Sequence, residues 1–165
     1  MSRKIYVLDA SVVLAMTKDD PAEVEVKAAT IEIFNMVEAG QVGIAVSTIL
    51  ATELLDEAWD RIEVGLDGRK GNAYEPSLQT ARLARDIRQW SRKKGRFKAL
   101  DTPDCLYVAL ASEIRATALL TCEGMGGKPN SLLGLSGEIQ ERYGVRVQLP
   151  QHALNAGTLF EHVDE

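Results

Sequence analysis

The feature that most constrains this chain is an apolar run that ends in an acid near its start. Ile5 to Leu8 are apolar or aromatic and lead directly into Asp9, and a second apolar run follows from Val12 to Met16. An uninterrupted apolar run is typical of a strand buried on both faces, as in parallel sheets covered by helices. Asp9 then lies at the carboxyl end of that strand, where open α/β sheets place their functional groups. Taken alone, Asp9 also fits a simpler role as the N-cap of the next helix.

The length and composition of the chain indicate one globular domain. The chain has 165 residues, of which 45% are hydrophobic and 26% charged, as in ordinary soluble proteins. We predict a domain over residues 1–150 and a C-terminal tail over 151–165 with at most one helical turn. No cleavable apolar segment precedes the first strand, and no run approaches the roughly 18 apolar residues of a membrane span. We therefore expect a cytoplasmic protein.

Composition argues against several kinds of site. Cys105 and Cys122 lack metal-type spacing and are expected to be reduced thiols. His152 and His162 both lie in the last fifteen residues, which argues against a histidine-based centre. The net charge of −5 argues against a protein that coats nucleic acid by charge alone. It remains compatible with an enzyme that holds cations through carboxylates and contacts nucleic acid locally.

Strand and helix patterns alternate along the chain. Strands are predicted at 5–8, 42–47, 117–121 and 144–150, and helices at 12–16, 21–39, 48–64, 78–94, 103–116 and 131–143. Thr102 is expected to cap the helix that starts at residue 103, and Gly65 to end the helix 48–64. The segment 65–77 is rich in turn residues and is predicted to be a loop. This alternation favours a three-layer α/β/α domain with a mainly parallel central sheet.

Four acids stand out because of where this layout places them. Asp9 ends the first strand, and Glu123 follows the strand 117–121 by two positions. Glu53 interrupts the leucine-rich side of a helix, and Asp104 lies in the first turn of an otherwise apolar helix. In a parallel sheet these positions all project to one edge. Four carboxylates there would repel one another, and a divalent cation would remove that penalty. Oxygen-only ligands favour Mg²⁺ or Mn²⁺ over Zn²⁺.

Each of these acids also has a simpler interpretation. Asp104 at the front of a helix is stabilised by the helix dipole by roughly 0.3–1 kcal/mol without any catalytic role. Glu53 fits a solvated helix residue, and Glu123 fits an ordinary loop acid. Their joint placement at one sheet edge is what favours the metal site over these separate interpretations.

Four short motifs follow one another in a characteristic order. They read VLDASVVLA at 7–15, STILATELLDE at 47–57, TPDCLYVALASE at 102–113 and ALLTCEGM at 118–125. In this order they resemble the PIN domain family, which includes the VapC-type toxins, over about residues 4–147. The resemblance implies a parallel sheet, a negatively charged pocket and Mg²⁺-dependent cleavage of RNA, with Mn²⁺ as the alternative ion.

The resemblance also implies roles for individual residues. By position, Asp9 matches the first acid of the family, Ser11 the hydroxyl residue beside it, and Glu53 the second acid. Asp104 matches the third acid of the family. The resemblance implies that Asp9 and Asp104 are direct metal ligands and that Glu53 and Glu123 complete the site or position water. The implied mechanism is metal-assisted hydrolysis, in which Mg²⁺ lowers the pKa of an attacking water. A homodimer is implied too and, for a toxin, an antitoxin partner.

The chain departs from the family pattern at the fourth acid. The family shows Thr-x-Asp at this position, whereas this chain has Thr121, Cys122 and Glu123. Glutamate keeps the charge but adds a methylene, which puts a second metal site in question more than the first. Asp101 is a second candidate for the third acid, and the small, apolar pattern that follows Asp104 favours Asp104.

A basic segment at 88–98 holds six basic residues and no acid, with Trp90 and Phe97 among them. Cations and aromatic rings together suit single-stranded RNA, in which bases stack and phosphates need partners. Alternatively, Trp90 faces the core and the charges form a solvated helix end. The residues predicted to bind substrate are Ser11, Thr121, Arg92, Lys93 and Arg96.

The glycine-rich segment 122–129 does not match a phosphate-binding loop. Walker A needs a glycine six places before its lysine, where this chain has Cys122, and a Ser or Thr after it, where it has Pro129. We expect these glycines to shape a rim of the pocket instead.

Three functions are compared on this basis. The leading prediction is a PIN-type, metal-dependent ribonuclease. In its most specific form, this prediction makes the chain the toxin of a type II toxin–antitoxin pair. The alternative is a PIN-like RNA-binding or interaction module with weak or no catalysis, which the departure at Glu123 motivates. A phosphotransferase that resembles the haloacid dehalogenases would need a second Asp where this chain has Ser11, and we regard it as the weakest of the three.

Overall fold

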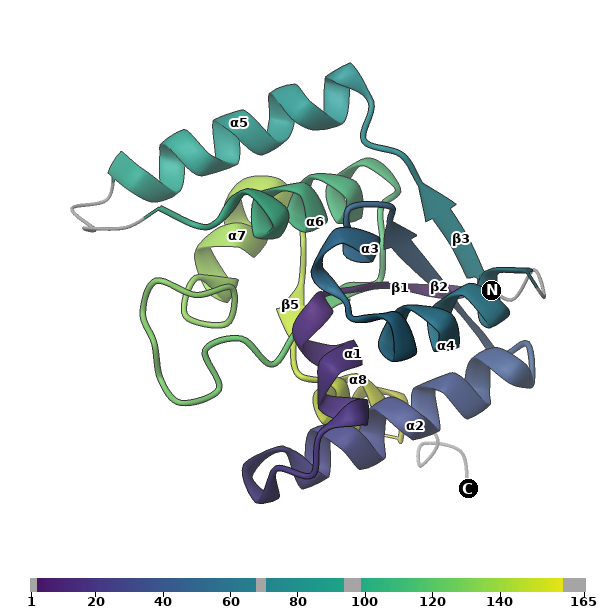
Figure 1. Cartoon of the computed structure of the whole chain (residues 1–165). Helices are drawn as coiled ribbons and strands as arrows, with labels where there is room; N and C mark the ends of the chain where they lie inside the picture. The colour runs from purple at the N-terminus through teal and green to yellow at the C-terminus, as the bar shows by residue number, and fades with distance from the viewer. Residues whose placement is uncertain (1–2, 68–70, 94–98, 159–165) are drawn as a thin grey trace, which may run out of the picture.

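The computed structural model describes residues 3–67, 71–93 and 99–158. Its centre is a parallel sheet in the order β3-β2-β1-β4-β5 (Figure 1). The strands are β1 (Lys4–Leu8), β2 (Val42–Ser47), β3 (Gly71–Tyr74), β4 (Ala118–Leu120) and β5 (Val147–Gln148). The inner strands read as apolar runs because both of their faces are covered: Val7, Leu8, Ala45, Val46, Leu119 and Leu120 are fully buried.

Helices cover both faces of this sheet, so the predicted three-layer α/β/α architecture is confirmed. They are α1 (Ala10–Thr17), α2 (Val24–Glu38), α3 (Leu50–Glu53), α4 (Asp56–Asp67), α5 (Leu78–Lys93), α6 (Thr102–Glu113), α7 (Ser136–Tyr143) and α8 (Pro150–Thr158). In Figure 1, α5 and α6 lie above the sheet and α1, α2 and α8 lie below it. In the described parts of the chain, no helix is long and apolar enough to cross a bilayer.

The strand order creates a topological switch between β1 and β4. The chain leaves β1 towards β2 on one side, and it leaves β4 towards β5 on the other. The two strands pair directly, with Leu8 opposite Leu120, and the backbone N–H of Asp9 donates to the carbonyl of Leu120 at 3.0 Å. In open α/β sheets the crevice at such a switch is the usual ligand site, so the fold directs attention to the residues that follow β1 and β4.

The segment 65–77, predicted to be a loop, contains the edge strand β3. Gly71 to Tyr74 pair in parallel with Ile44 to Ser47 of β2. This strand is short, and none of its four residues is fully buried, so it lacks the apolar pattern of the inner strands. At Gly71, an added Cβ would lie 2.7 Å from Cγ1 of Ile44, which shows that glycine here permits the close pairing of the strands. The turn-rich composition of the segment 65–77 therefore gave no indication of this strand.

The helix predicted over 48–64 is divided into α3 and α4. Leu54 adopts an extended conformation, with φ −93° and ψ 144°, and ends α3 directly after Glu53. The break buries Leu54 and turns Leu55 outward, where 78% of it is exposed. Gly65 does not end the second part, because α4 continues to Asp67. Tertiary packing overrides helix propensity at this point.

Two helix starts differ from the prediction. The N-cap of α6 is Asp101, so Thr102 is the first helical residue rather than the cap. The helix predicted over 131–143 begins only at Ser136. The turns before it place Gly134 against the backbone of Lys128 and Pro129 in the same connecting segment. An added Cβ at Gly134 would lie 2.3 Å from the carbonyl oxygen of Lys128.

This crowding predicts opposite effects for two neighbouring glycines. Gly134→Ala is expected to destabilise the fold by about 1–3 kcal/mol, because backbone atoms cannot move aside easily. Gly137→Ala is the matched control: nothing lies within 4 Å of its added Cβ, and the residue is inside α7. It is expected to stabilise by about 0.5–1 kcal/mol. Urea unfolding of both variants checks this, and equal effects would contradict it.

The C-terminal segment forms more structure than the single turn that the sequence predicts. Helix α8 spans nine residues and packs against α2. Ala153 is 4% exposed and belongs to the main core. The described part of the segment 151–165 therefore adds to the layer below the sheet.

Candidate active site

Asp9 lies at the switch point, buried beneath the ends of β1 and β4. Only 4% of it is exposed. Its Oδ2 accepts hydrogen bonds from Ser11 Oγ at 2.5 Å and Thr121 Oγ1 at 2.6 Å. Burial raises the pKa of Asp9, and these two hydroxyls oppose the rise. Asp9 holds the N-cap position of α1, and the backbone N–H groups of Ala10 and Ser11 also oppose the rise of its pKa. Capping alone does not explain the two hydroxyl groups that donate to its Oδ2.

The two hydroxyls also tie the strand ends together. Ser11 Oγ accepts from the backbone N–H of Cys122 at 3.1 Å, and Thr121 Oγ1 accepts from the backbone N–H of Glu123 at 3.0 Å. The two hydroxyl oxygens lie 3.2 Å apart. Ser11 and Thr121, predicted to bind substrate, thus face Asp9 and fix its orientation. A contact between either of them and a substrate stays a prediction.

Asp104 and Glu123 form a hydrogen-bonded carboxyl pair beside Asp9. Asp104 is 8% exposed in the first turn of α6. Burial raises its pKa most, followed by the negative charges of Glu123 and Asp9. Burial also raises the pKa of Glu123, and the charge of Asp9 adds to this rise, while the hydrogen bond from Asp104 opposes it. The pair therefore holds a proton that an isolated carboxyl would lose, because two like charges in one desolvated site disfavour full ionisation.

Glu53 reaches the same site from the end of α3. Its Oε2 accepts a hydrogen bond from the hydroxyl of Tyr107, a fully buried residue of α6. Burial raises the pKa of Glu53, and the charges of Asp9 and Asp101 raise it further. The break after Glu53 separates it from α4, so the short helix α3 aims the residue at the site. Sequence reasoning did not identify Tyr107, which the helical pattern marks only as core.

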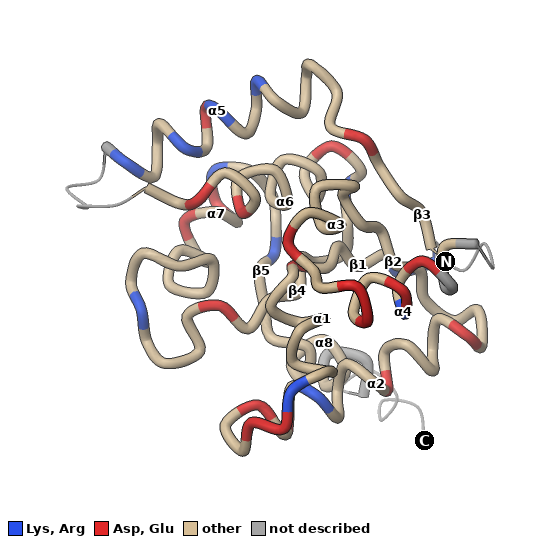
Figure 2. Tube along the Cα trace, viewed as in Figure 1, with Lys and Arg blue, Asp and Glu red and all other residues tan. Residues whose placement is uncertain are grey.

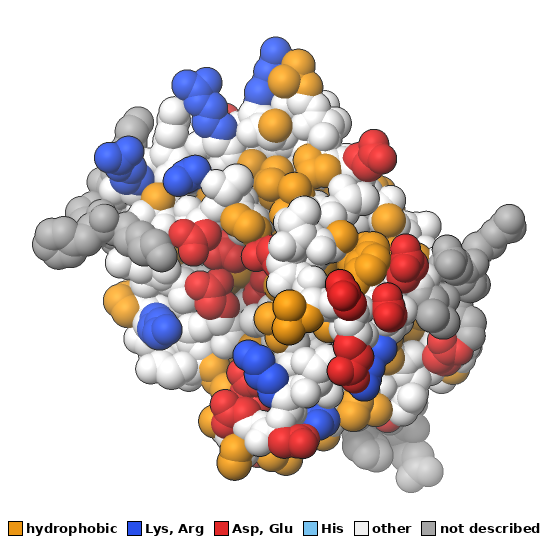
Figure 3. All heavy atoms as spheres, viewed as in Figure 1, with side chains coloured by type: hydrophobic (Ala, Val, Ile, Leu, Met, Phe, Trp, Pro, Cys, Tyr) orange, Lys and Arg blue, Asp and Glu red, His pale blue; other side chains and the backbone are white. Residues whose placement is uncertain are grey.

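The electrostatic contacts show that the four predicted acids converge. The charge of Asp9 raises the pKa of Glu53, Asp104 and Glu123 alike. The exposed Asp101 acts on the same three side chains, so it is a neighbour of the cluster. Figure 3 shows acidic side chains gathered below the basic side chains of α5, and Figure 2 traces them to separate parts of the chain. The convergence expected from the sheet topology is present.

The chemistry of this cluster suits a hard divalent cation. Its donors are carboxylate and hydroxyl oxygens, the ligands that Mg²⁺ and Mn²⁺ prefer. The two ion pairs between described side chains, Lys27–Asp19 and Arg61–Glu57, lie outside it. Within the described residues, however, no three Asp, Glu, His or Cys side chains stand at the spacing that holds one ion. Several carboxylate oxygens are instead engaged by Ser11, Thr121 and Tyr107 or by the shared proton.

The predicted basic surface lies only partly within the described residues. Arg92 is exposed on α5. The structure does not describe the side chain of Lys93, and it does not describe Arg96 or Phe97. Trp90 is 8% exposed and packs edge-on against the ring of Tyr143, with 5.5 Å between ring centroids. The core interpretation of Trp90 is therefore the correct one, and its ring is not available for base stacking.

Comparisons with known proteins identify the fold. No family model matches the chain, and no curated protein matches it. A toxin–antitoxin complex from Klebsiella pneumoniae is similar over 88% of this chain and 97% of the matched chain, with a TM-score of 0.53 and 19% identity. DNA-bound VapBC from Salmonella typhimurium is similar over 89% and 98%, with a TM-score of 0.53 and 19% identity.

A third solved structure gives the same result. VapBC2 from Rickettsia felis, bound to a DNA fragment from its promoter, is similar over 87% of this chain and 97% of the matched chain, with a TM-score of 0.54 and 14% identity. At these identities the likeness shows the fold alone. The chain has a VapC-like PIN fold, which confirms the resemblance inferred from its motifs at the level of architecture.

Proposed function

We propose that this chain is a divalent-metal-dependent endoribonuclease and the toxin of a toxin–antitoxin pair. The observation that carries the proposal is the convergence of Asp9, Glu53, Asp104 and Glu123 at the switch point of the sheet, where the charge of Asp9 raises the pKa of the other three. A protein keeps such a costly arrangement where a cation or a reaction uses it. The fold shared with toxin–antitoxin complexes supports the biological role and an antitoxin partner.

Each residue has a defined part in this proposal. Asp9 and Asp104 would hold the ion directly, and Glu53 and Glu123 would complete its shell or orient the attacking water. When bound, Mg²⁺ or Mn²⁺ supplies charge stabilisation to the phosphodiester and activates water. Ser11 and Thr121 keep the Asp9 carboxylate fixed, and Tyr107 does the same for Glu53. Positioning and charge are most of what phosphodiester hydrolysis requires of a protein.

A cleavage assay tests the proposed activity. Purified protein is incubated with single-stranded RNA in Mg²⁺, in Mn²⁺ and in EDTA. We expect internal cleavage with either ion and none in EDTA. Cleavage that persists in EDTA, or no cleavage across a varied set of RNA sequences, would contradict the proposal. Co-purification with the product of the adjacent gene, and loss of cleavage in that complex, would support the toxin role, and sedimentation would check the predicted homodimer.

Thr121 offers a further prediction on how Asp9 is held. Thr121→Val removes one of the two hydroxyl donors to Asp9 Oδ2, so the charged carboxylate is less well stabilised. We expect Mn²⁺ binding to weaken roughly tenfold, as for other groups that orient a metal ligand. Thr121→Ser keeps the hydroxyl and is the matched control. Calorimetric titration with Mn²⁺ measures both variants, and equal affinities would show that the hydroxyl does not support Asp9.

A second candidate function is a PIN-like RNA-binding or interaction module without catalysis. It is favoured by the carboxyl pair of Asp104 and Glu123, and by the lack, among the described residues, of three acids spaced for one ion. Mn²⁺ titration of the wild type and of Asp104→Asn separates the two functions. The nuclease requires that Asp104→Asn weaken Mn²⁺ binding, whereas identical titrations would favour the module.

A further inference from the structure

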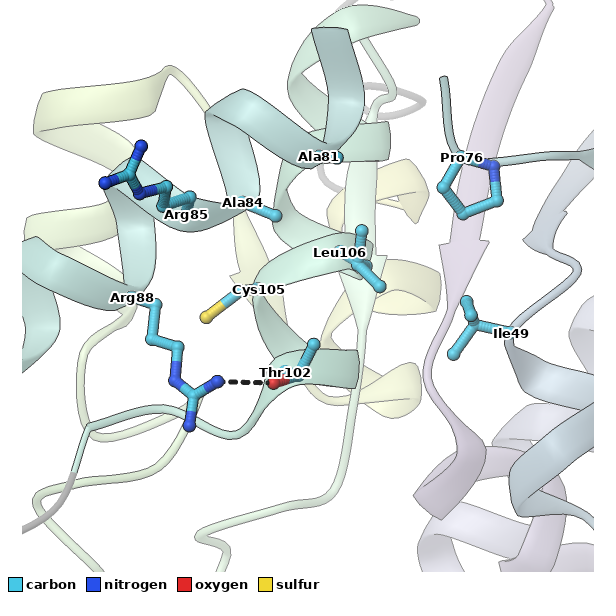
Figure 4. Close-up of a pocket in the computed structure, with 9 residues that line it drawn as sticks. All are labelled: Ile49, Pro76, Ala81, Ala84, Arg85, Arg88, Thr102, Cys105 and Leu106. Atoms are coloured by element: carbon cyan, nitrogen blue, oxygen red, sulfur yellow. Dashed lines mark hydrogen bonds between the residues drawn. The ribbon is translucent and has the colours of Figure 1, made fainter. Parts of the chain in front are cut away.

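A cavity of about 340 Å³ lies between α5 and α6 (Figure 4). Its walls are mainly apolar and are formed by Ile49, Pro76, Ala81, Ala84 and Leu106. Helix α5 contributes two alanines, Ala81 and Ala84, to this lining, and their short side chains leave the space between α5 and α6 open. Its volume is within the range of roughly 300–1,000 Å³ that is typical of small-molecule sites.

Arginines of α5 flank this cavity. Arg85 and Arg88 both line it, and the guanidinium of Arg85 turns outward in Figure 4. Nη1 of Arg88 donates a hydrogen bond to Oγ1 of Thr102 at 2.8 Å, which holds this guanidinium at the α6 side of the cavity. Arg92, exposed one turn further along α5, continues the same stripe, because residues three and four apart share a helix face. The cavity is therefore apolar inside and cationic along one edge.

The same elements carry both the cavity and the acidic site. Ile49 directly precedes α3, which ends in Glu53. Thr102 and Leu106 belong to α6, the helix that carries Asp104 on another of its faces. Thr102 directly follows Asp101, whose charge raises the pKa of Glu53, Asp104 and Glu123. Figure 3 shows apolar side chains between the basic side chains of α5 and the acidic ones below. The cavity and the acidic site are therefore formed in part by the same segments, the start of α3 and the first turns of α6.

We propose that this cavity receives one unpaired nucleobase of the RNA strand whose backbone is cleaved at the acidic site, and that Arg85 and Arg88 hold the adjoining phosphates. This inference rests on the proposed function for its substrate. Single-stranded nucleic acid is the polymer that combines a negative charge at every residue with a flat, largely apolar group beside it. The cavity would then give the enzyme a base preference at one nucleotide position relative to the cleaved bond, because a base that does not fit the cavity cannot enter it.

Methyl NMR of the full chain tests the inference without requiring catalysis. The alanine and leucine methyls are labelled, and AMP, GMP, CMP and UMP are titrated separately, with ribose 5-phosphate as the base-free comparison. We expect saturable shifts of the methyls of Ala81, Ala84 and Leu106 with at least one nucleotide, and none with ribose 5-phosphate. Equal shifts with ribose 5-phosphate would overturn the proposal, because the arginines would then bind phosphate alone.

A filled cavity provides the second arm of the test. Ala81→Phe places a ring in the cavity from an exposed position on α5, and Gln79→Phe adds the same ring two residues earlier, on the opposite side of the helix. We expect Ala81→Phe to abolish the nucleotide shifts and to lower kcat/KM for single-stranded RNA roughly tenfold. Gln79→Phe should retain both. Equal behaviour of the two variants would overturn the proposal.

The outcomes separate this inference from the proposed nuclease. Nucleotide-dependent shifts in a protein that cleaves no RNA would support the base site and contradict the nuclease. Cleavage that is unaffected by Ala81→Phe, with no nucleotide shifts, would support the nuclease and contradict the base site. Shifts of the same methyls that depend on protein concentration alone would mean that a second copy of the chain occupies the cavity, which also overturns the inference.

Discussion

Asp9→Asn is expected to lower metal-dependent RNA cleavage by about 10²–10³-fold. Asp9 is the buried acid whose charge acts on the three others, Glu53, Asp104 and Glu123. Asparagine has nearly the same shape, and its side-chain oxygen can still accept from Ser11 and Thr121. The substitution therefore removes the charge while the hydrogen-bonded geometry is kept.

Thermal unfolding of the Asp9→Asn variant in EDTA should show a fold at least as stable as the wild type. Burial raises the pKa of Asp9, so its charged form is destabilised in the folded state. Asp19→Asn is the matched control, since Asp19 is 98% exposed in its side chain and pairs with Lys27 away from the cluster. Unchanged cleavage by Asp9→Asn, or an equal loss in Asp19→Asn, would contradict a role for Asp9 in the chemistry.

Asp104→Asn is expected to stabilise the metal-free protein by about 1–2 kcal/mol at pH 8, or roughly 3–6 °C in Tm. Burial and the charges of Glu123 and Asp9 raise the pKa of Asp104 in the folded state. The folded state therefore binds the proton more tightly than the unfolded state does. The stabilisation that this proton gives the folded state is complete at pH values below the pKa of Asp104 in the unfolded chain, which is near 3.8. It is lost as the pH rises towards the folded pKa.

Thermal melts in EDTA at several pH values measure this effect. The Tm of Asp104→Asn should exceed that of the wild type by little at pH 5 and by more at pH 8. Added Mg²⁺ should narrow the gap, because a ligand that binds the folded wild type stabilises it. A gap that shrinks as the pH rises in EDTA would show that the carboxyl is not held in the environment described.

The inner part of the fold could be predicted from the sequence because its signals are local. The apolar run of β2, Val42–Ser47, ends where the pattern ends, and Asp9 follows β1 as expected. The edge strand β3 could not be predicted, because its stability comes from backbone pairing with β2 and not from apolar side chains. The break at Leu54 was equally hidden, since Leu54 and Leu55 have the same propensity and only tertiary packing distinguishes them.

The candidate site was predictable in composition but not in detail. The four acids could be identified because parallel strands bring their carboxyl ends to one edge. The sequence does not show that Tyr107 donates to Glu53 across 54 positions, or that Asp104 and Glu123 share a proton. The cavity beside the site depends on which face of α5 carries Ala81 and Ala84, and that requires the packing of α5 on α6.

The most direct test of the central claim is a crystal structure of the protein soaked with Mn²⁺ near pH 8, with anomalous scattering recorded. The account predicts an anomalous peak coordinated by carboxylate oxygens of Asp9 and Asp104, with Glu53 or Glu123 directly bound or bridged by water. The proton shared by Asp104 and Glu123 would then be released. A protein saturated with Mn²⁺ whose peaks all lie away from Asp9, or a cluster that stays metal-free, would contradict the account.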